Sequence, residues 1–357
     1  LRAQAPRGMA EYQRARAIAE PRARVVALEK FLGEFGSGGG ANRAREDVLR
    51  TLVEADESDA VIGAFVRRAL AEATPFQKTE LPQRFADALL ELRRALPLAA
   101  EISANGATAQ LRSTHGRILL ETGDREGARR VLEGVVAANP ELTTAVRVLA
   151  SIEPDAGMRR ELEALAYLTD PAGVAPESAL LDRVYAARFA RAVPVIRRPE
   201  APAGRRRVLV EFFTSASCLP CQGAELAFDA LRERFPASEL VAIAHHVNVP
   251  GPDPLTHAGA EAWRLRRGAE GVPMFYVDGE PSSEGGTRAA AGRIFEELER
   301  AVLAKLNGRP SSLRLKVTRR GGRLEASVSA APGVAVRLAL IERRVTHSGP
   351  NAIRFHT

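Results

Sequence analysis

The chain has 357 residues, which is too long for one ordinary core and predicts two or three domains. Its 45% hydrophobic and 27% charged residues are typical of a globular protein, and no apolar run is long enough to cross a bilayer. The net charge of +7 comes from arginines that alternate with glutamates along helical stretches, and aromatic residues make up only 5% of the chain. We therefore expect neither a membrane span nor a nucleic-acid partner.

The first residues carry a weak export signal. The chain begins with Leu1 rather than methionine, and Ala3-Gln4-Ala5 fits the small-x-small pattern of a signal-peptidase site. We expect an extracytoplasmic location, periplasmic or secreted, with most of the signal peptide missing. A cytoplasmic location is the alternative.

The residue pattern over 6–192 predicts a helical, repeat-like domain. Apolar residues recur three and four apart, and glycine or proline interrupts them. Between Gln110 and Glu141 the spacing of small and apolar residues resembles one tetratricopeptide repeat. This resemblance rests on the positions Gly116, Leu119, Ala128, Leu132 and Pro140. Small residues would let two helices approach, the leucines would fill the seam, and Gly123-Asp124 would supply the turn. Such arrays often bind peptides, so we expect a protein partner here, although packing alone explains the same residues.

Two further segments flank a central domain. Residues 193–207 contain three prolines and a cluster of arginines, which predicts a linker. Residues 311–357 alternate apolar and polar side chains around the Gly321-Gly322 turn, and Val334 to Ile341 predicts a third strand. The last residues, from Asn351 to His356, also alternate like a strand. We expect a small, incomplete antiparallel β-domain.

The central segment, 208–307, places both cysteines of the chain at the junction of a strand and a helix. The apolar run Val208 to Phe213 predicts a buried strand, and the residues after Cys221 show helical spacing. At a helix N-terminus, unpaired N–H groups and the helix dipole stabilise a thiolate. We therefore expect Cys218 to be exposed and activated, with Pro220 in the first turn of the helix.

The sequence gives less support to other roles of the cysteine pair. A disulfide that closes so short a loop constrains the unfolded chain little, which argues against a structural staple. A zinc site needs two further ligands, and the adjacent His245 and His246 would point to opposite faces of a strand. A redox pair is the favoured interpretation, without metal or organic cofactor, and an inert pair or a metal site are the alternatives.

A second element follows the cysteines at some distance. Leu240 to Ala244 predicts a strand, Ala258 to Arg267 a helix, and Val272-Pro273 opens another strand that ends in an Asp-Gly turn. A last amphipathic helix carries Ile294, Leu298, Val302 and Leu306 on one face. The order of elements is thus strand, CxxC helix, strand, helix, Val-Pro strand, hairpin and helix.

This order, with Cys218-Leu219-Pro220-Cys221 and Val272-Pro273 as its two anchors, resembles the thioredoxin superfamily over about residues 205–307. The resemblance implies an α/β thioredoxin-like domain in which Cys218 attacks and Cys221 resolves. It implies that Pro273 is a cis-proline facing the cysteines, and that Leu219, Pro220 and Val272 line the substrate groove.

The resemblance has departures. Glu211 is the nearest counterpart of the family's buried acid, but it lies seven residues before Cys218, one more than in thioredoxin itself, so a solvent-facing glutamate is the alternative to a proton acceptor. Ser217 stands where a tryptophan is usual. The spacing is more similar to exported bacterial thioredoxin-like proteins, some of which end in a β-domain.

The remaining candidates have plainer explanations beside the functional one. His246 and His257 could line the groove or be ordinary loop histidines, and Trp263 fits a core position. Ser215 has the place of a peroxiredoxin serine, but the accompanying proline is absent.

We therefore expect a thiol–disulfide oxidoreductase whose partners are protein thiols and disulfides. A non-catalytic interaction scaffold, which binds partners through the helical region and retains a vestigial thioredoxin-like module, is the alternative.

Overall fold

The structure is a computed structural model that describes residues 7–38, 40–189, 193–202, 204–310, 313–342, 345–347 and 353–356. The chain divides into two compact units, Leu1–Leu162 and Glu163–Thr357. The division falls inside a helix, whereas the sequence suggested it at the proline-rich segment after residue 192. Within the described residues, no helix is long and apolar enough to cross a membrane.

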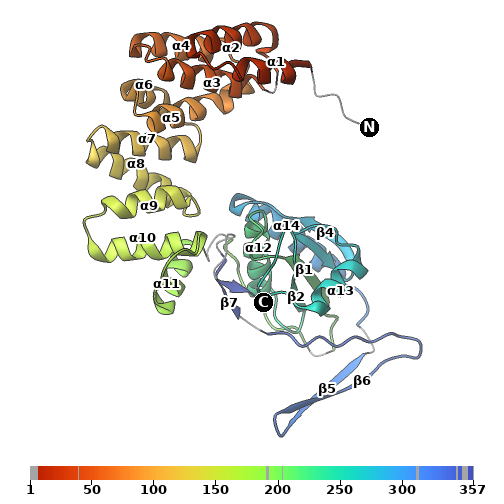
Figure 1. The fold of residues 1–357 in the computed structure, drawn as a ribbon. Coiled ribbons are helices and arrows are strands. Elements are labelled where there is room, and N and C mark those ends of the chain that lie inside the picture. Colours follow the sequence, from red (N-terminus) through yellow and green to blue (C-terminus); the bar gives the residue numbers. More distant parts are fainter. Residues whose placement is uncertain are drawn as a thin grey trace. The chain divides into compact units, whose positions relative to one another are not determined.

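The first unit is helical and its helices follow one another in chain order (Figure 1). Side-chain caps fix several of the starts: Ser58, Thr108 and Asp124 each accept a bond from a backbone N–H in the first turn of the helix that follows. The elements are α1 (Arg7–Arg16), α2 (Pro21–Phe35), α3 (Ala41–Glu54), α4 (Asp59–Glu72), η1 (Gln77–Thr79), α5 (Leu81–Leu92), α6 (Leu96–Ser103), α7 (Ala109–Glu121), α8 (Arg125–Ala138), α9 (Thr143–Ile152) and α10 (Ala156–Thr169).

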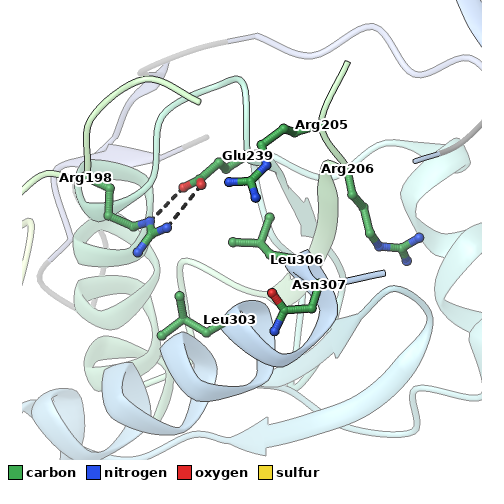
Figure 2. A pocket seen from close by; sticks show the side chains of 7 residues that line it. All are labelled: Arg198, Arg205, Arg206, Glu239, Leu303, Leu306 and Asn307. Carbon is green, nitrogen blue, oxygen red and sulfur yellow. Dashed lines mark hydrogen bonds and ion pairs between the residues drawn. The ribbon is translucent and has the colours of Figure 1, made fainter. Parts of the chain in front are cut away.

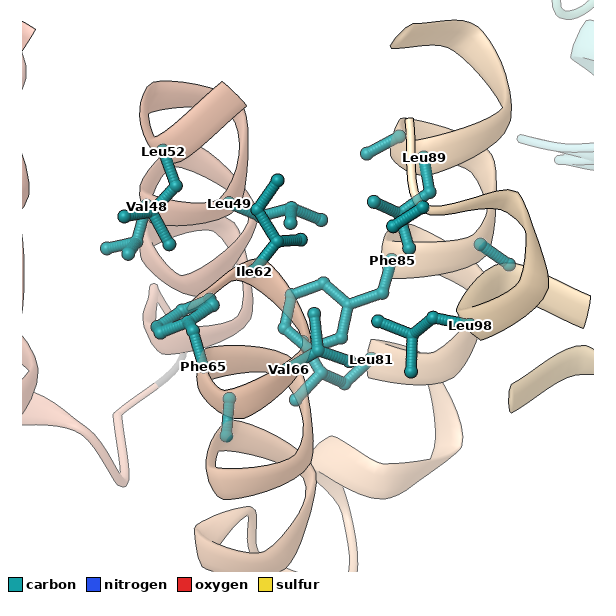
Figure 3. Close-up of a cluster of buried hydrophobic side chains, with 14 of the residues drawn as sticks. Val48, Leu49, Leu52, Ile62, Phe65, Val66, Leu81, Phe85, Leu89 and Leu98 are labelled. Atoms are coloured by element: carbon teal, nitrogen blue, oxygen red, sulfur yellow. The ribbon is translucent and has the colours of Figure 1, made fainter. Parts of the chain in front are cut away.

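Apolar side chains from consecutive helices form one continuous core in this unit. Figure 3 shows part of it, where Leu49 of α3, Ile62 and Phe65 of α4, and Phe85 of α5 converge. The rings of Phe65 and Phe85 meet edge to face with centroids 6.1 Å apart. Each helix of the cluster therefore buries one stripe against its neighbours, as the periodicity predicted.

The predicted helix pair around Gly116 is confirmed as α7 and α8. A Cβ atom at Gly116 would come within 2.7 Å of Leu132 Cγ, so the helices approach closely where the sequence placed small residues. Gly123 turns the chain with a φ of +91°. Leu119 is half-buried, and its neighbour Ile118, which the sequence analysis did not single out, is fully buried.

The second unit contains a four-stranded mixed sheet of order β2-β1-β3-β4. Strand β1 pairs in parallel with β2 and antiparallel with β3, and the two-residue loop Asp278-Gly279, with φ of +50° and +85°, joins β3 to β4. The elements are α11 (Ser178–Arg188), β1 (Val208–Thr214), α12 (Cys221–Arg234), β2 (Leu240–His246), α13 (Ala258–Arg267), β3 (Met274–Val277), β4 (Glu280–Glu284), η2 (Arg288–Ala290) and α14 (Ala291–Leu306).

The central strand β1 is covered on both faces. Val210 and Phe212 pack with residues of α12 and α14, whereas Phe213 packs on the other face with Trp263 of α13. The sheet is thus the middle layer of three, as expected for a strand with a nearly continuous apolar run (Figure 1).

Residues 193–207, predicted as a linker, make defined contacts with the second unit where they are described. Val193 and Val195 pack against the core of the sheet. Arg198 donates to both carboxylate oxygens of Glu239 at 2.7 and 3.1 Å, and its N–H donates to the carbonyl of Arg234. The prolines exclude regular structure but do not prevent these contacts, so the described part of the segment belongs to the second unit.

The C-terminal residues form less sheet than predicted. Strands β5 (Arg314–Arg320) and β6 (Arg323–Ser329) make a hairpin, and β7 (Val345–Thr346) pairs with β8 (Phe355–His356). The third strand predicted at 334–341 is wrong, because these residues form no helix or strand. The predicted final strand falls partly outside the described residues, since 351 and 352 are not described.

Candidate functional site

The two cysteines lie in a tight turn between β1 and α12. They form a disulfide with a Cα–Cα distance of 5.3 Å. The N–H of Cys218 donates to the carbonyl of Ser215 at 3.1 Å, and the N–H of Cys221 donates to the carbonyl of Cys218 at 3.0 Å. Cys221 is the first residue of α12, and Pro220 is its N-cap rather than part of its first turn.

The prediction that Cys218 faces solvent is wrong for this oxidised form. Cys218 is 3% exposed and Cys221 is fully buried, whereas Leu219 between them is 65% exposed. The Cys218 side chain turns inward toward the loop before β3, and Leu219 and Pro220 form the outer surface of the turn. The accessible surface of the turn is therefore formed by Leu219 and Pro220, and Cys218 contributes little to it.

The first N–H groups of α12 are already engaged. The N–H of Gln222 donates to the carbonyl of Leu219 at 3.2 Å, and the N–H of Gly223 donates to the carbonyl of Gly286 at 2.9 Å. Together with the bond of Cys221, these contacts occupy the donors that the sequence argument offered to a thiolate. The expectation that these three N–H groups are free to stabilise a thiolate therefore needs correction.

Pro273 lies beside the cysteine turn, as predicted. The Val272–Pro273 peptide bond is cis, and the Val272 carbonyl oxygen lies 3.9 Å from Cys218 Sγ. Gly285 packs so closely on the Pro273 ring that a Cβ atom there would overlap it. The N–H of Gly286 donates to the carbonyl of Pro220 at 3.0 Å, which ties this loop to the turn.

Glu211 does not lie with the cysteines. It points to the face of β1 that α13 covers, accepts a bond of 2.5 Å from Trp263 Nε1, and forms an ion pair with Arg267. His245 Nε2 lies 3.6 Å from the same carboxylate. Burial raises the pKa of Glu211, but the neighbouring His245, the hydrogen bond from Trp263 and the charge of Arg267 outweigh it and lower the pKa below its usual value. These contacts give Glu211 a structural role.

Glu225 is a buried carboxyl that sequence reasoning missed. It is 3% exposed on α12, four residues after Cys221, and accepts a bond of 2.6 Å from the hydroxyl of Thr214 at the end of β1. The only signal in the sequence was the spacing, because positions four apart share a face of a helix. Glu225 is therefore on the same side of the sheet as the cysteines, whereas Glu211 is not.

The two candidate histidines have separate positions. His257 is exposed and caps α13, where its Nδ1 accepts a bond from the N–H of Ala260. His246 is buried, and its Nδ1 lies 3.0 Å from Asp253 Oδ2. His257 thus fits the alternative of an ordinary loop histidine, whereas His246 is a buried residue at the end of β2.

Among the described residues, no group of three or more His, Cys, Asp or Glu side chains could hold a metal ion. A hollow of about 200 Å³ lies at the start of β2 and the end of α14 (Figure 2). Its lining includes Arg198, Arg205 and Arg206. Glu239 pairs with Arg198, and Asp278 pairs with Arg206 at 2.5 Å. Two of the three arginines are thus paired with carboxylates, so the lining of this hollow does not indicate an anion site.

No protein-family model matches the chain, and a comparison with curated proteins finds no match either.

Proposed function

We propose that the protein is a thiol–disulfide oxidoreductase that exchanges electrons with partner proteins through Cys218 and Cys221. The observation that carries this proposal is the disulfide at the start of α12, next to Val272 and Pro273. A bond that closes so short a loop adds little stability, so a chemical role is the better explanation for it.

The reaction follows from the two oxidation states of the pair. In the reduced protein the Cys218 thiolate attacks a partner disulfide, which forms a mixed disulfide and releases one partner thiolate. Cys221, as thiolate, then attacks the Cys218 sulfur, which restores the internal disulfide and releases the second partner thiolate. Two electrons pass from the protein to the partner, and the reverse sequence oxidises a partner dithiol. No metal or organic cofactor takes part.

The surface around the turn suits an extended peptide with apolar side chains. Leu219 and Pro220 are exposed, and Val272 and Pro273 are half-buried beside them. We propose that these residues form the substrate groove, with the backbone at Val272 available to a partner chain. This arrangement also supports the assignment of residues 208–307 to a thioredoxin-like fold.

The proposal also includes a location for the protein and a role for its helical unit. A periplasmic or secreted location, as in exported bacterial thioredoxin-like proteins, would suit disulfide chemistry. We propose that the tetratricopeptide-like helices of the first unit bind a protein partner. Two hollows of about 350 and 340 Å³ flank α2 and include Phe31 and Phe65 in their linings.

Replacing each cysteine in turn tests the roles. Cys221→Ser leaves an attacking thiol without a resolving partner, so mixed disulfides with protein clients should accumulate and be visible on non-reducing gels. Cys218→Ser is the matched control and should trap nothing, although it also removes one sulfur. Equal trapping by both variants would contradict the assignment of attacking and resolving roles.

A non-catalytic scaffold is the second candidate, and the 3% exposure of Cys218 favours it. In that case the first unit would bind partners and the cysteine module would be vestigial. Alkylation of the reduced protein separates the two functions. A catalytic Cys218 should react faster than a free thiol at neutral pH, because a position beside a helix N-terminus favours the thiolate form. Slower alkylation, with trapping by neither variant, would support the scaffold.

A further inference from the structure

A buried carboxylate and a buried histidine lie behind the turn that carries Cys218. Asp253, in the loop between β2 and α13, is 4% exposed, and His246, the last residue of β2, is 6% exposed. His246 Nδ1 lies 3.0 Å from Asp253 Oδ2. The exchange reaction described above uses neither side chain.

The same carboxylate oxygen also holds the cysteine turn. Asp253 Oδ2 accepts a bond of 2.8 Å from the N–H of Ala216, two residues before Cys218. Within the turn, the N–H of Ser217 donates to Ser215 Oγ at 3.3 Å and the N–H of Cys218 donates to the Ser215 carbonyl at 3.1 Å. The side chain of Asp253 thus fixes the Ser215–Ala216 peptide, and Ser215 in turn accepts the bond from the Cys218 N–H.

The loop around Asp253 is built to present this oxygen. Asp253 Oδ1 accepts a bond of 2.7 Å from the N–H of Leu255, and Asn248 Oδ1 accepts one of 2.9 Å from the N–H of Asp253. The hydroxyl of Thr256 donates to the carbonyl of His246 at 2.8 Å. A buried carboxylate is tolerated where donors surround it, and this one contacts two backbone N–H groups and an imidazole.

The contacts keep Asp253 ionised. Burial raises its pKa, but the hydrogen bond from His246, with the backbone bonds from Leu255 and Ala216, outweighs burial and lowers the pKa below its usual value. Asp253 is therefore a charge-assisted acceptor for the Ala216 N–H at neutral pH, and such bonds are stronger than neutral ones.

We propose that Asp253, oriented by His246, is a positioning residue that holds the Cys218 turn in the geometry needed for attack on a partner disulfide. The inference rests on the proposed exchange function. Attack on sulfur requires the nucleophile to be held at a defined distance and direction, and small displacements of a reacting group slow such steps strongly. His246 acts one step further away, because it fixes the orientation of the carboxylate.

The full-length Cys221→Ser protein isolates this step, since only Cys218 can then react. Its rate constant with oxidised glutathione is measured from pH 5 to 10, so that the plateau reports the fully ionised thiolate. Asp253→Asn should lower the plateau at least tenfold. His246→Leu should do the same, whereas His246→Asn, whose amide N–H can replace Nδ1–H, should stay within threefold of the parent.

Glu261→Gln is the matched control. Glu261 Oε1 accepts a bond of 2.5 Å from the N–H of Asn248, so it holds the same loop through the backbone of Asn248 rather than through a bond to the cysteine turn. This variant should keep the parent plateau. If Asp253→Asn is folded and reaches the parent plateau, or if Glu261→Gln falls equally, the positioning role is overturned while exchange stands. Unfolding of both Asp253→Asn and His246→Leu would overturn it as well, because the pair would then maintain the domain rather than the turn. A parent protein that does not react with glutathione overturns the exchange function itself.

Discussion

Strands β1 and β5 each have seven residues and alternate in side-chain direction, but they have opposite environments. Val210 and Phe212 of β1 are fully buried, whereas Leu315 and Val317 of β5 are 53% and 54% exposed. β1 has a strand on each side and helices on both faces, and β5 pairs only with β6 among the described strands. The apolar pattern thus determines that a strand forms, and the covering layers determine how much that strand stabilises the fold.

The largest expected effect is the difference in free energy of unfolding between a substitution in β1 and one in β5. Phe212 stacks on Phe275 with centroids 4.3 Å apart and also contacts Phe228. Phe212→Ala should lower the free energy of unfolding by about 3–5 kcal/mol, because it leaves a cavity between sheet and helix. Val317→Ala in β5 is the control and should change it by less than about 0.5 kcal/mol. Urea titration at pH 7 measures both, and equal losses would mean that the hairpin is covered in solution.

An intermediate effect concerns the charged residue within β1. The pKa of Glu211 is lowered in the folded protein, so its stabilising contribution is complete above the ordinary value of 4.5 and is lost as the pH falls through the folded pKa. Glu211→Gln should cost about 1–3 kcal/mol at pH 7 because Arg267 loses its partner. The difference from the parent should shrink below pH 4.5.

Urea titrations from pH 7 to pH 3 check this dependence. Glu233→Gln, on an exposed face of α12, is the control and should show no such change. A difference that stays constant over the whole range would contradict the assigned ion pair.

The smallest expected effect concerns local unfolding, which we compare between the β5–β6 hairpin and the proline-rich segment. Arg198 and Arg206 of the proline-rich segment form ion pairs with Glu239 and Asp278. Arg314 and Arg323 of the hairpin are exposed. A two-stranded hairpin alone is only marginally stable. Brief trypsin digestion should therefore cut between 309 and 323 several times faster than between 197 and 207. Mass spectrometry of the first fragments checks the order, and a first cut after Arg198 would restore the idea of a free linker.

Local patterns were sufficient for much of the second unit. The helix Ala258–Arg267 was predicted with its observed bounds, β1 was one residue longer than expected, and the Asp278-Gly279 turn formed as predicted. These features depend on neighbours in sequence, such as turn glycines and the period of apolar residues. The proximity of Pro273 to Cys218 was also predicted, through the order of elements.

The residues that sequence reasoning misplaced depend on contacts between distant segments. Nothing near Glu211 in the chain indicates that Trp263 and Arg267 will approach its face of the strand. Likewise, Asp253 gains its significance only when its loop folds against Ala216. The exposure of Cys218 was wrongly predicted because helix position alone does not reveal what the neighbouring loop covers.

One small contact near the end of the chain has a consequence for biosynthesis. Ile353 is fully buried against Leu226 of α12 and Ala291, and Arg354 bonds Asp182 of α11 at 3.0 Å. On the ribosome, α11 and α12 emerge long before these residues. The nascent chain must therefore hold the cysteine helix in an unfinished core while translation continues. The packing around Leu226 of α12 is consequently completed late, after the segment that carries Cys218 and Cys221 has been synthesised.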